Sequence, residues 1–335
     1  MEVKKAPLKF LVIRFSSIGD IVLTSPIVRN IKKNYPNCEL HFLCKSPFID
    51  LVKNSPFIDK SWGLNEKLSE LIPALKKEKF THIIDLHKNL RSFSIKRKLG
   101  IPSYSFDKLN LEKFLLTQFT VNRLPDEHIV DRYFKGIRQL NIKNDGLGLD
   151  FYPSKNAIEI ANNVVNKLPK SFLVLVIGTA HETKSPPVSI LDEIIQQNNY
   201  PFVLMGGKNE KDKAKQLVKN HPQKKLYNLC GTLSIEASAA VIQHANLVVT
   251  PDTGLMHISA AFNKKIISIW GSTIPEFGMS PYYGNDSIKN KKAEVKGLSC
   301  RPCSKIGYNS CPKKHFNCMK LQNIEQINAW IKELY

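Results

Sequence analysis

The sequence predicts an α/β protein built from two parallel-sheet domains. Short apolar strands alternate with amphipathic helical patterns along nearly all of the 335 residues, which is typical of parallel sheets with helical crossovers. A chain of this length usually exceeds a single compact core. Residues 144–154 contain glycine and proline and show little periodicity, so we place the domain boundary there. We expect domains over residues 1–150 and 151–320, followed by a terminal helix over 321–335.

The first strand and the loop after it carry the strongest candidate for chemistry. An apolar run ends at Ile13, and small polar residues, Gly19 and Asp20 follow before a helical pattern begins. Ligands of parallel sheets bind beyond the carboxyl ends of the strands, where helices start. Asp20 is therefore a candidate catalytic carboxylate. Capping of the next helix is the alternative role, since Asp is a preferred N-cap residue.

Two further segments of the first domain bring polar residues to a predicted strand end or helix face. Residues 39–44 and 81–87 read as strands, and the second ends at His87, followed by Lys88 and Arg91. These side chains either face a ligand or lie in a solvated loop. A helix over 126–140 places His128 and Arg132 four residues apart on one face, as an anion-binding pair or a surface stripe.

The second domain is expected to begin with an amphipathic helix over 157–168 and to continue with alternating strands and helices. Its predicted strands cover 172–177, 202–205, 226–229, 246–250 and 265–269, and its last predicted helix covers 324–334.

One strand of this domain enters a helix through Asp252-Thr253-Gly254. The first amides of a helix lack helical partners, and glycine lets a phosphate approach, so this junction is a ready anion site. Asp252 could accept a hydrogen bond from a ribose hydroxyl or cap the helix. His257 lies on the first helical turn, where it either reaches a phosphate or serves a structural role.

Composition restricts the partners. The net charge of +20 favours anionic ligands, although the abundance of lysine and asparagine can also reflect genome composition alone. No segment approaches the ~20 apolar residues of a membrane span, so we expect a cytoplasmic protein with at most peripheral contact to the inner face of the membrane.

Four of the seven cysteines cluster near the end of the chain. Cys300 and Cys303 form a C-x-x-C pair, and Cys311 and Cys318 follow with His315 between them. This spacing is compatible with a structural zinc knuckle, with reduced thiols or with disulfides.

Two blocks resemble a known family: Ile-Arg-Phe-Ser-Ser-Ile-Gly-Asp ending at Asp20, and Asp-Thr-Gly-Leu-Met-His-Ile-Ser-Ala-Ala beginning at Asp252. In this order and separation they resemble glycosyltransferase family 9, the bacterial heptosyltransferases of lipopolysaccharide core assembly. The resemblance implies a GT-B fold, with two Rossmann-like domains facing a central cleft. It implies that the acceptor binds the N-terminal half and the nucleotide-sugar the C-terminal half, and that the last helix packs back on the N-terminal domain. It also implies inverting transfer from ADP-L-glycero-D-manno-heptose with no cofactor required for catalysis.

The resemblance assigns roles residue by residue. Asp20 falls on the proposed catalytic base, and Lys184 on the lysine that meets the donor diphosphate. The Ser-Pro-Pro that follows Lys184 departs from the family, which often has an aromatic residue before a single proline, and this leaves other donor sugars open. The remaining donor-binding candidates are Thr179, Glu210 at the ribose, Leu233 beside the adenine, Asp252, Thr253, Gly254 and His257. The acceptor-binding candidates are Ser17, Gly19, His87, Lys88, Arg91 and Arg132.

Two other protein classes are less consistent with the sequence. A dinucleotide-dependent oxidoreductase would carry G-x-G-x-x-G, which the chain lacks, and a P-loop is also absent. A basic nucleic-acid-binding protein would need a recognition helix or an aromatic platform, which the α/β pattern does not provide. The expected partners are therefore a nucleotide-sugar donor and a lipopolysaccharide core or lipid A acceptor, bound by a monomer without nucleic acid.

Overall fold

A computed structural model describes residues 7–288 and 290–335, which form two compact units. Unit 1 comprises the chain up to Lys108 and Glu127–Tyr152, and unit 2 comprises Leu109–Asp126 and Pro153–Tyr335. The main boundary therefore lies two residues from the expected one. The short segment Leu109–Asp126 departs from the expected division, because it belongs to unit 2.

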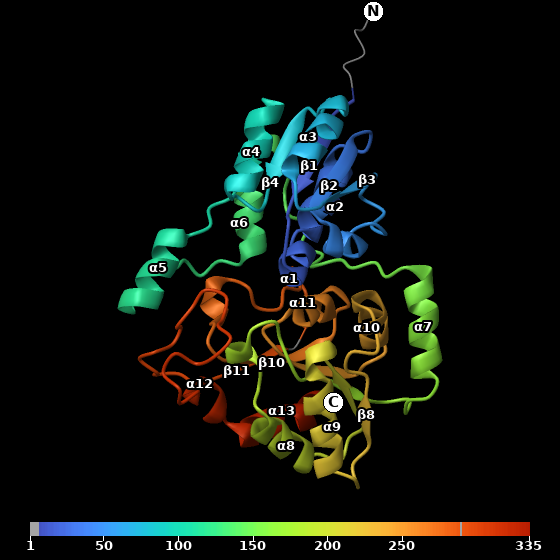
Figure 1. The fold of residues 1–335 in the computed structure, drawn as a ribbon, viewed down its shortest axis with the longest axis vertical. Coiled ribbons are helices and arrows are strands. Elements are labelled where there is room, and N and C mark those ends of the chain that lie inside the picture. Colours follow the sequence, from blue (N-terminus) through green and yellow to red (C-terminus); the bar gives the residue numbers. More distant parts are fainter. Residues whose placement is uncertain (1–6, 289) are drawn as a thin grey trace, which may run out of the picture. The chain divides into compact units, whose positions relative to one another are not determined.

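Unit 1 contains a five-stranded, all-parallel sheet in the order β3-β2-β1-β4-β5 (Figure 1). The central position of β1 gives its carboxyl end neighbours on both sides, which is the geometry expected of a ligand-binding strand. The strands are β1 (Lys9–Ile13), β2 (Glu39–Lys45), β3 (Lys60–Leu64), β4 (His82–Asp85) and β5 (Ser103–Ser105). The helices are α1 (Ile18–Val22), α2 (Ser25–Asn34), η1 (Ser46–Leu51), α3 (Leu68–Lys77), α4 (Leu90–Leu99), α6 (Ile129–Gly136) and η2 (Arg138–Leu140).

The core of unit 1 follows the strand alternation of the sequence. Leu11 and Ile13 of β1 point to the same face, and there they pack with Ile72 and Leu75 of α3 and Ile95 of α4. The apolar stripe of α3 therefore covers this face.

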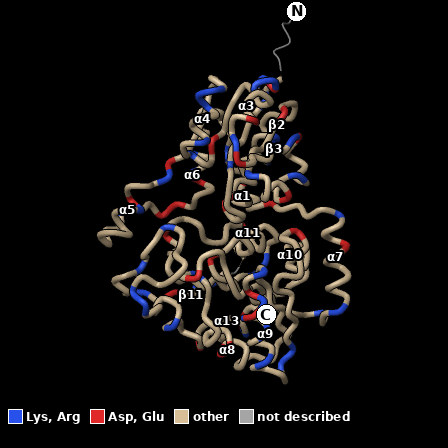
Figure 2. Tube along the Cα trace, viewed as in Figure 1, with Lys and Arg blue, Asp and Glu red and all other residues tan. Residues whose placement is uncertain are grey.

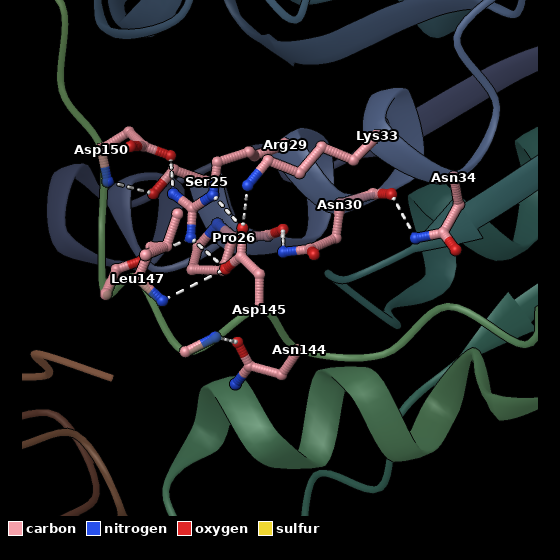
Figure 3. Close-up of polar contacts among 12 residues, drawn as sticks. Ser25, Pro26, Arg29, Asn30, Lys33, Asn34, Asn144, Asp145, Leu147 and Asp150 are labelled. Carbon is pink, nitrogen blue, oxygen red and sulfur yellow. Dashed lines mark hydrogen bonds and ion pairs between the residues drawn. The ribbon is translucent and has the colours of Figure 1, made fainter. Parts of the chain in front are cut away.

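Helix α2 is tied to the end of unit 1 by a buried arginine (Figure 3). Arg29 donates to both carboxylate oxygens of Asp145 at 2.9 and 2.8 Å, to the Gly148 carbonyl at 2.9 Å and to Asp150. Lys33, one turn further along α2, also donates to Asp145 at 2.7 Å. Burial opposes ionisation of Asp145, but the hydrogen bonds from Arg29 and Lys33 hold its pKa well below the usual range. The segment that reads as a loop in the sequence is thus fixed by charge-assisted hydrogen bonds.

Unit 2 contains a six-stranded, all-parallel sheet in the order β11-β10-β9-β6-β7-β8. The strands are β6 (Leu173–Val176), β7 (Phe202–Met205), β8 (Leu226–Asn228), β9 (Leu247–Pro251), β10 (Lys265–Trp270) and β11 (Asn290–Glu294). The helices are α5 (Asn110–Phe119), α7 (Lys155–Val165), η3 (Glu182–Lys184), α8 (Val188–Gln196), η4 (Lys208–Glu210), α9 (Lys211–Asn220), α10 (Ile235–Ile242), α11 (Gly254–Ala261), η5 (Pro275–Phe277), α12 (Asn317–Lys320) and α13 (Ile324–Leu334). Two parallel sheets with helical crossovers confirm the predicted fold class.

The terminal helix α13 belongs to unit 2. Its apolar stripe, Ile327, Ile331 and Leu334, is buried with Ile194 of α8 and Ile267 of β10. The helix has the predicted bounds, and this stripe packs on the sheet of unit 2, while packing of the helix on the N-terminal domain stays a prediction. The helix follows α12 after residues 321–323, and a single apolar stripe of this kind is typical of a helix that covers one face of a sheet.

Among the described residues, no helix combines the length and apolar character needed to cross a bilayer.

Candidate active-site residues in the two units

Asp20 lies in the first turn of α1, directly beyond the carboxyl end of β1. Its Oδ2 accepts hydrogen bonds from the Ser17 amide at 2.9 Å and the Ser17 hydroxyl at 2.6 Å. Ser17 is the N-cap residue of α1, and Asp20 occupies the third helical position, as in a capping box. The carboxylate therefore takes part in capping, although it is not itself the N-cap.

The second carboxylate oxygen of Asp20 forms an ion pair with Arg14, the residue that follows β1. The guanidinium is nearly buried and also donates to the Ser16 carbonyl at 3.0 Å, to the Leu86 carbonyl and to the Tyr133 hydroxyl at 3.4 Å. Burial lowers the pKa of Arg14, but Asp20 and the other negative groups outweigh this effect, and the net shift is upward. Arg14 thus stays charged and holds the carboxylate of Asp20 in place.

His87 lies two residues beyond β4, and the charges of Arg14 and Asp20 both act on it. Its ring meets Phe15 edge-on, with centroids 4.9 Å apart, and its Nδ1 has no hydrogen-bond partner among the described residues. Burial, together with the positive charges of Arg14 and Lys108, lowers the pKa of His87 to about 4. A neutral imidazole at this position can exchange a hydrogen bond with a hydroxyl group at physiological pH.

The other acceptor candidates differ in their surroundings. Gly19 is buried within α1, whereas Lys88 directs its ammonium to the Phe106 carbonyl at 3.0 Å. Arg91 is exposed on the first turn of α4. Arg132 is buried within α6, and this burial lowers its pKa, so it is not part of a surface stripe. Of the six candidates, Ser17 contacts Asp20 directly, and His87 interacts with it electrostatically.

In unit 2 the structure brings two donor candidates into direct contact. Lys184, at the end of η3, places its Nζ 2.8 Å from Oδ2 of Asp252. The hydroxyl of Thr273 donates to the same oxygen at 2.8 Å. Asp252 directly follows β9 and precedes α11, so the lysine is held at the strand end where the anion site was predicted.

Helix α11 has the N-terminus that the sequence predicts. Thr253 is its N-cap residue in extended conformation, and Gly254 is its first helical residue. The amides of this turn and the positive end of the helix dipole favour an anion here. His257 is buried at the fourth helical position.

Glu210 lies over the ends of two neighbouring strands of unit 2, because two glycines leave room for it. A Cβ atom at Gly178, after β6, would overlap the Glu210 side chain, and one at Gly206, after β7, would lie 2.8 Å from its Cβ. Glu210 and Thr179 line an open cavity of about 620 Å³, which also receives Lys213 from α9. Thr179 donates its hydroxyl to the His181 carbonyl at 2.7 Å and so shapes its own loop.

Leu233 precedes α10 and is partly exposed, as a residue that packs against a flat ligand would be.

The four clustered cysteines are free thiols in the structure. Cys300 Sγ lies 3.7 Å from His315 Nε2, and burial, reinforced by the neighbouring thiols, raises the pKa of Cys318 to about 12. Within the described part of the chain, the cysteines do not form a group whose ligand atoms lie within 4.8 Å of one another. The donor atoms therefore do not fit a bound ion as they stand, and structural zinc stays a prediction.

Another set of donor atoms in the described residues meets that distance, namely Glu39, His41 and Glu78. Lys9 forms ion pairs with both carboxylates, at 3.0 and 2.5 Å, and so supplies the positive charge that a metal would bring.

Arg14, Tyr133, Thr273 and Lys213 were missed as site residues by the sequence reasoning. A cation that directly follows a buried strand was the available signal for Arg14. No local signal identified the others, because their partners are far away in the sequence.

The chain is similar to one protein family over most of its length. The family model described as "Glycosyltransferase family 9 (heptosyltransferase)" matches residues 68–307. Lipooligosaccharide heptosyltransferase 2 of Campylobacter jejuni subsp. jejuni serotype O:2 is 27% identical over 329 residues, which cover 95% of each chain.

Solved structures show the same fold. The glycosyl transferase family 9 structure from Veillonella parvula DSM 2008 superposes with a TM-score of 0.78 at 19% identity, covering 98% of each chain. The Escherichia coli heptosyltransferase WaaC, solved with ADP, superposes with a TM-score of 0.68 at 18% identity, covering 98% of this chain and 100% of that chain.

Proposed function

The chain belongs to glycosyltransferase family 9, the heptosyltransferase family, and on that premise we propose that it transfers a heptose from ADP-L-glycero-D-manno-heptose to a sugar hydroxyl of the lipopolysaccharide core, with inversion. The observation that carries the proposal is the Lys184–Asp252 pair at the start of α11. It places a cation and a helix N-terminus together, which suits a diphosphate. The ADP bound by WaaC supports the nucleotide assignment.

The acceptor hydroxyl is activated by Asp20 in this mechanism. As the hydroxyl oxygen attacks the anomeric carbon of the heptose, its proton passes to the Asp20 carboxylate, and the bond from that carbon to the diphosphate oxygen breaks. A positioned base contributes ~10²–10⁴-fold to such a step. Arg14 and Ser17 hold the carboxylate from two sides, which fixes the direction from which it accepts the proton.

The leaving diphosphate gains negative charge as this bond breaks. Lys184 is held beside the start of α11 by its ion pair with Asp252, and donors that are in place before the reaction stabilise the transition state without reorganisation. These groups supply positive charge to the leaving group, so the proposed step is written without a metal. In this proposal Glu210, which lines the cavity of unit 2, accepts hydrogen bonds from the ribose hydroxyls.

A nucleotide panel and a product analysis test this function. Thermal unfolding is measured with ADP, UDP, GDP and NAD, and we expect ADP alone to raise the midpoint strongly. Transfer from ADP-heptose to a core oligosaccharide is then followed by mass spectrometry, and the anomeric configuration of the product is read by NMR. Stabilisation by UDP or GDP alone would point to another sugar donor, and stabilisation by NAD alone would replace the transferase by an oxidoreductase. A product that retains the donor configuration would exclude direct attack assisted by Asp20.

We also propose that the protein docks on the anionic inner membrane surface through the outer face of α4. Leu90 and Phe93 on this face are 87% and 58% exposed, and Arg97 and Lys98 are exposed beside them. Residues 86–106 contain no acidic side chain. The basic residues of α4 are visible as blue segments of the trace (Figure 2). Exposed apolar groups on a helix that carries basic and no acidic residues are typical of helices that lie in an anionic lipid interface.

Vesicle co-sedimentation tests the docking surface. Arg97→Gln with Lys98→Gln should weaken binding to phosphatidylglycerol-containing vesicles about 30-fold, at about 1 kcal/mol per cation. Leu90→Ser with Phe93→Ser should also weaken it, whereas Ile158→Ser, which removes a half-exposed apolar group on α7, should not. Turnover of a water-soluble acceptor should stay at the wild-type level. Equal binding of all variants, or equal binding to neutral phosphatidylcholine vesicles, would refute this surface.

A further inference from the structure

The cysteine loop, residues 300–318, is hydrogen-bonded to the loop that carries Lys184. The Thr183 amide donates to the Tyr308 carbonyl at 3.1 Å, and the Tyr308 amide donates to the Thr183 hydroxyl at 2.8 Å. Gly307 lies directly over the same loop, since a Cβ atom there would come within 2.7 Å of His181 Cβ and 3.1 Å of Lys184 Cδ. The cysteine loop is therefore part of the wall around the candidate diphosphate site.

Arg301, inside the C-x-x-C pair, fixes the loop that follows β10. Its guanidinium donates to the Gly271 carbonyl at 2.7 Å and to the Thr273 carbonyl at 3.0 Å, and thereby holds the chain on both sides of residue 272. It also donates to Glu294 at 2.9 Å and to the Val295 carbonyl at 3.2 Å. The side chain is 6% exposed, so each of these bonds forms away from bulk water.

The same loop holds the donor site. The Ser272 hydroxyl donates to the Thr183 hydroxyl at 2.9 Å, and its amide donates to the Thr183 carbonyl at 3.2 Å. The Thr273 hydroxyl donates to Asp252 at 2.8 Å, on the oxygen that also receives Lys184. A continuous path of hydrogen bonds thus runs from Arg301 through residues 271–273 to Asp252 and Lys184.

We propose that Arg301 is a positioning residue for the donor diphosphate: it sets residues 271–273, which orient Asp252, and Asp252 in turn holds the Lys184 ammonium in place. This inference rests on the proposed function, because it assumes that Lys184 meets a diphosphate. Arginine suits the task because its planar group presents five donors in a fixed arrangement. A lysine has three donors on a flexible stem and cannot serve both loop carbonyls and Glu294 in the same directions.

A purely structural role would also make Arg301 sensitive to substitution, since its loss removes a hydrogen-bond donor from Glu294 and from three backbone carbonyls. The two roles differ in what they change. If the role is purely structural, the substitution lowers thermal stability and affects the donor and the acceptor alike. A positioning role raises the donor KM and weakens nucleotide binding, while the acceptor KM stays at its wild-type value.

The experiment compares Arg301→Gln and Arg301→Lys with wild type by ADP calorimetry and by steady-state kinetics against each substrate. We expect Arg301→Gln to weaken ADP binding and raise the donor KM at least 10-fold, and Arg301→Lys to recover part of the loss. Arg29→Lys is the matched control, because it changes a similarly buried and bonded arginine in unit 1. It should lower stability while ADP affinity stays unchanged.

A double-mutant cycle with Thr273→Val keeps the inference testable even if Arg301→Gln does not fold. Thr273→Val alone should weaken ADP binding, since Asp252 loses one of its two donors. Combined with Arg301→Lys, it should weaken binding by less than the product of the single effects, because both act on the same path. Effects that multiply fully, or wild-type ADP affinity in Arg301→Lys and Thr273→Val, would overturn the inference. Wild-type protein that binds no ADP would instead remove the proposed function, and this inference with it.

Discussion

Replacement of Asp20 by asparagine separates the chemical role of the carboxylate from its role in capping. The amide oxygen of asparagine can still accept hydrogen bonds from the amide and hydroxyl of Ser17, so α1 keeps its cap. The side chain loses its negative charge and its basicity, and Arg14 loses the partner of its ion pair. The substitution therefore changes proton transfer strongly and helix geometry little.

The magnitude follows from these two losses. Without a base, turnover should fall ~10²–10⁴-fold. Loss of one partner from a fully buried ion pair costs ~3–5 kcal/mol of stability. The Asp20 side chain is 18% exposed, and Arg14 keeps the Ser16 and Leu86 carbonyls, so a cost of about 1–3 kcal/mol is expected here.

The assay measures kcat for heptosyl transfer, the affinity for ADP and the free energy of unfolding on the same preparations. ADP affinity should stay within about two-fold of wild type, because the donor groups all lie in unit 2. Ser154→Ala removes the N-cap bond of α7 at similar structural cost and should leave kcat unchanged. If Asp20→Asn turns over at the wild-type rate, Asp20 is not the base. If ADP affinity falls in parallel with kcat, the loss reflects general disruption.

Three further outcomes are expected. Asp252→Ala should weaken ADP binding about 10- to 100-fold, because Lys184 loses the charged partner that orients it, and calorimetry at wild-type affinity would reject that role. Because the pKa of His87 is about 4 in the folded protein against about 6.5 in the unfolded chain, the free energy of unfolding should decline as pH falls from 6.5 to 4. His87→Gln should flatten that decline in urea titrations, and an identical pH profile would contradict the assignment. Arg29→Lys should cost about 1–3 kcal/mol of stability in urea titrations, since the bidentate contact to Asp145 is lost, and an unchanged midpoint would show that this contact contributes nothing.

The strands could be predicted because each buried strand is a continuous apolar run. The strands at 173–176 and 202–205 are fully buried, and their runs stand out from their polar surroundings. Of the edge strands, β8 was predicted, whereas β3, β5 and β11 were not, because their side chains are half-exposed and mixed in character. Local pattern thus identifies the interior of a sheet better than its edges.

The sheet on which a helix packs is harder to predict from the sequence than the presence of the helix. The apolar stripe of α13 was read correctly from the sequence, but the stripe does not specify which sheet it covers. Segment Leu109–Asp126 lies between the two parts of unit 1 in the chain, yet Leu116 is buried with Ile274 and Phe277 of unit 2. Such long-range choices depend on shape matching between surfaces that are distant in the sequence.

In the candidate site, too, local features were predictable and long-range contacts were not. The junction at Asp252, Thr253 and Gly254 is local, so its spacing was enough to predict an anion site. The contacts that orient the functional groups join residues far apart: Tyr133 lies 119 residues from Arg14, and Arg301 lies 30 residues from Gly271. No local motif marks Tyr133 or Gly271, because each arginine donates to single carbonyl, hydroxyl or carboxylate groups that many loops could supply.

A capping role for Asp20 does not exclude a catalytic one, since one carboxylate oxygen accepts hydrogen bonds from Ser17 and the other pairs with Arg14. A cap on a five-residue helix is worth ~1 kcal/mol, and the Ser17 contacts alone account for it. Capping does not require a buried arginine, yet Arg14 is 7% exposed and pairs with the other oxygen. Bringing a guanidinium out of water costs several kcal/mol, and surrounding groups must offset this cost. Burying Arg14 costs much more free energy than the cap contributes, so capping alone does not explain it. We infer that Arg14 keeps the Asp20 carboxylate ionised and fixed in one direction beyond the central strand β1.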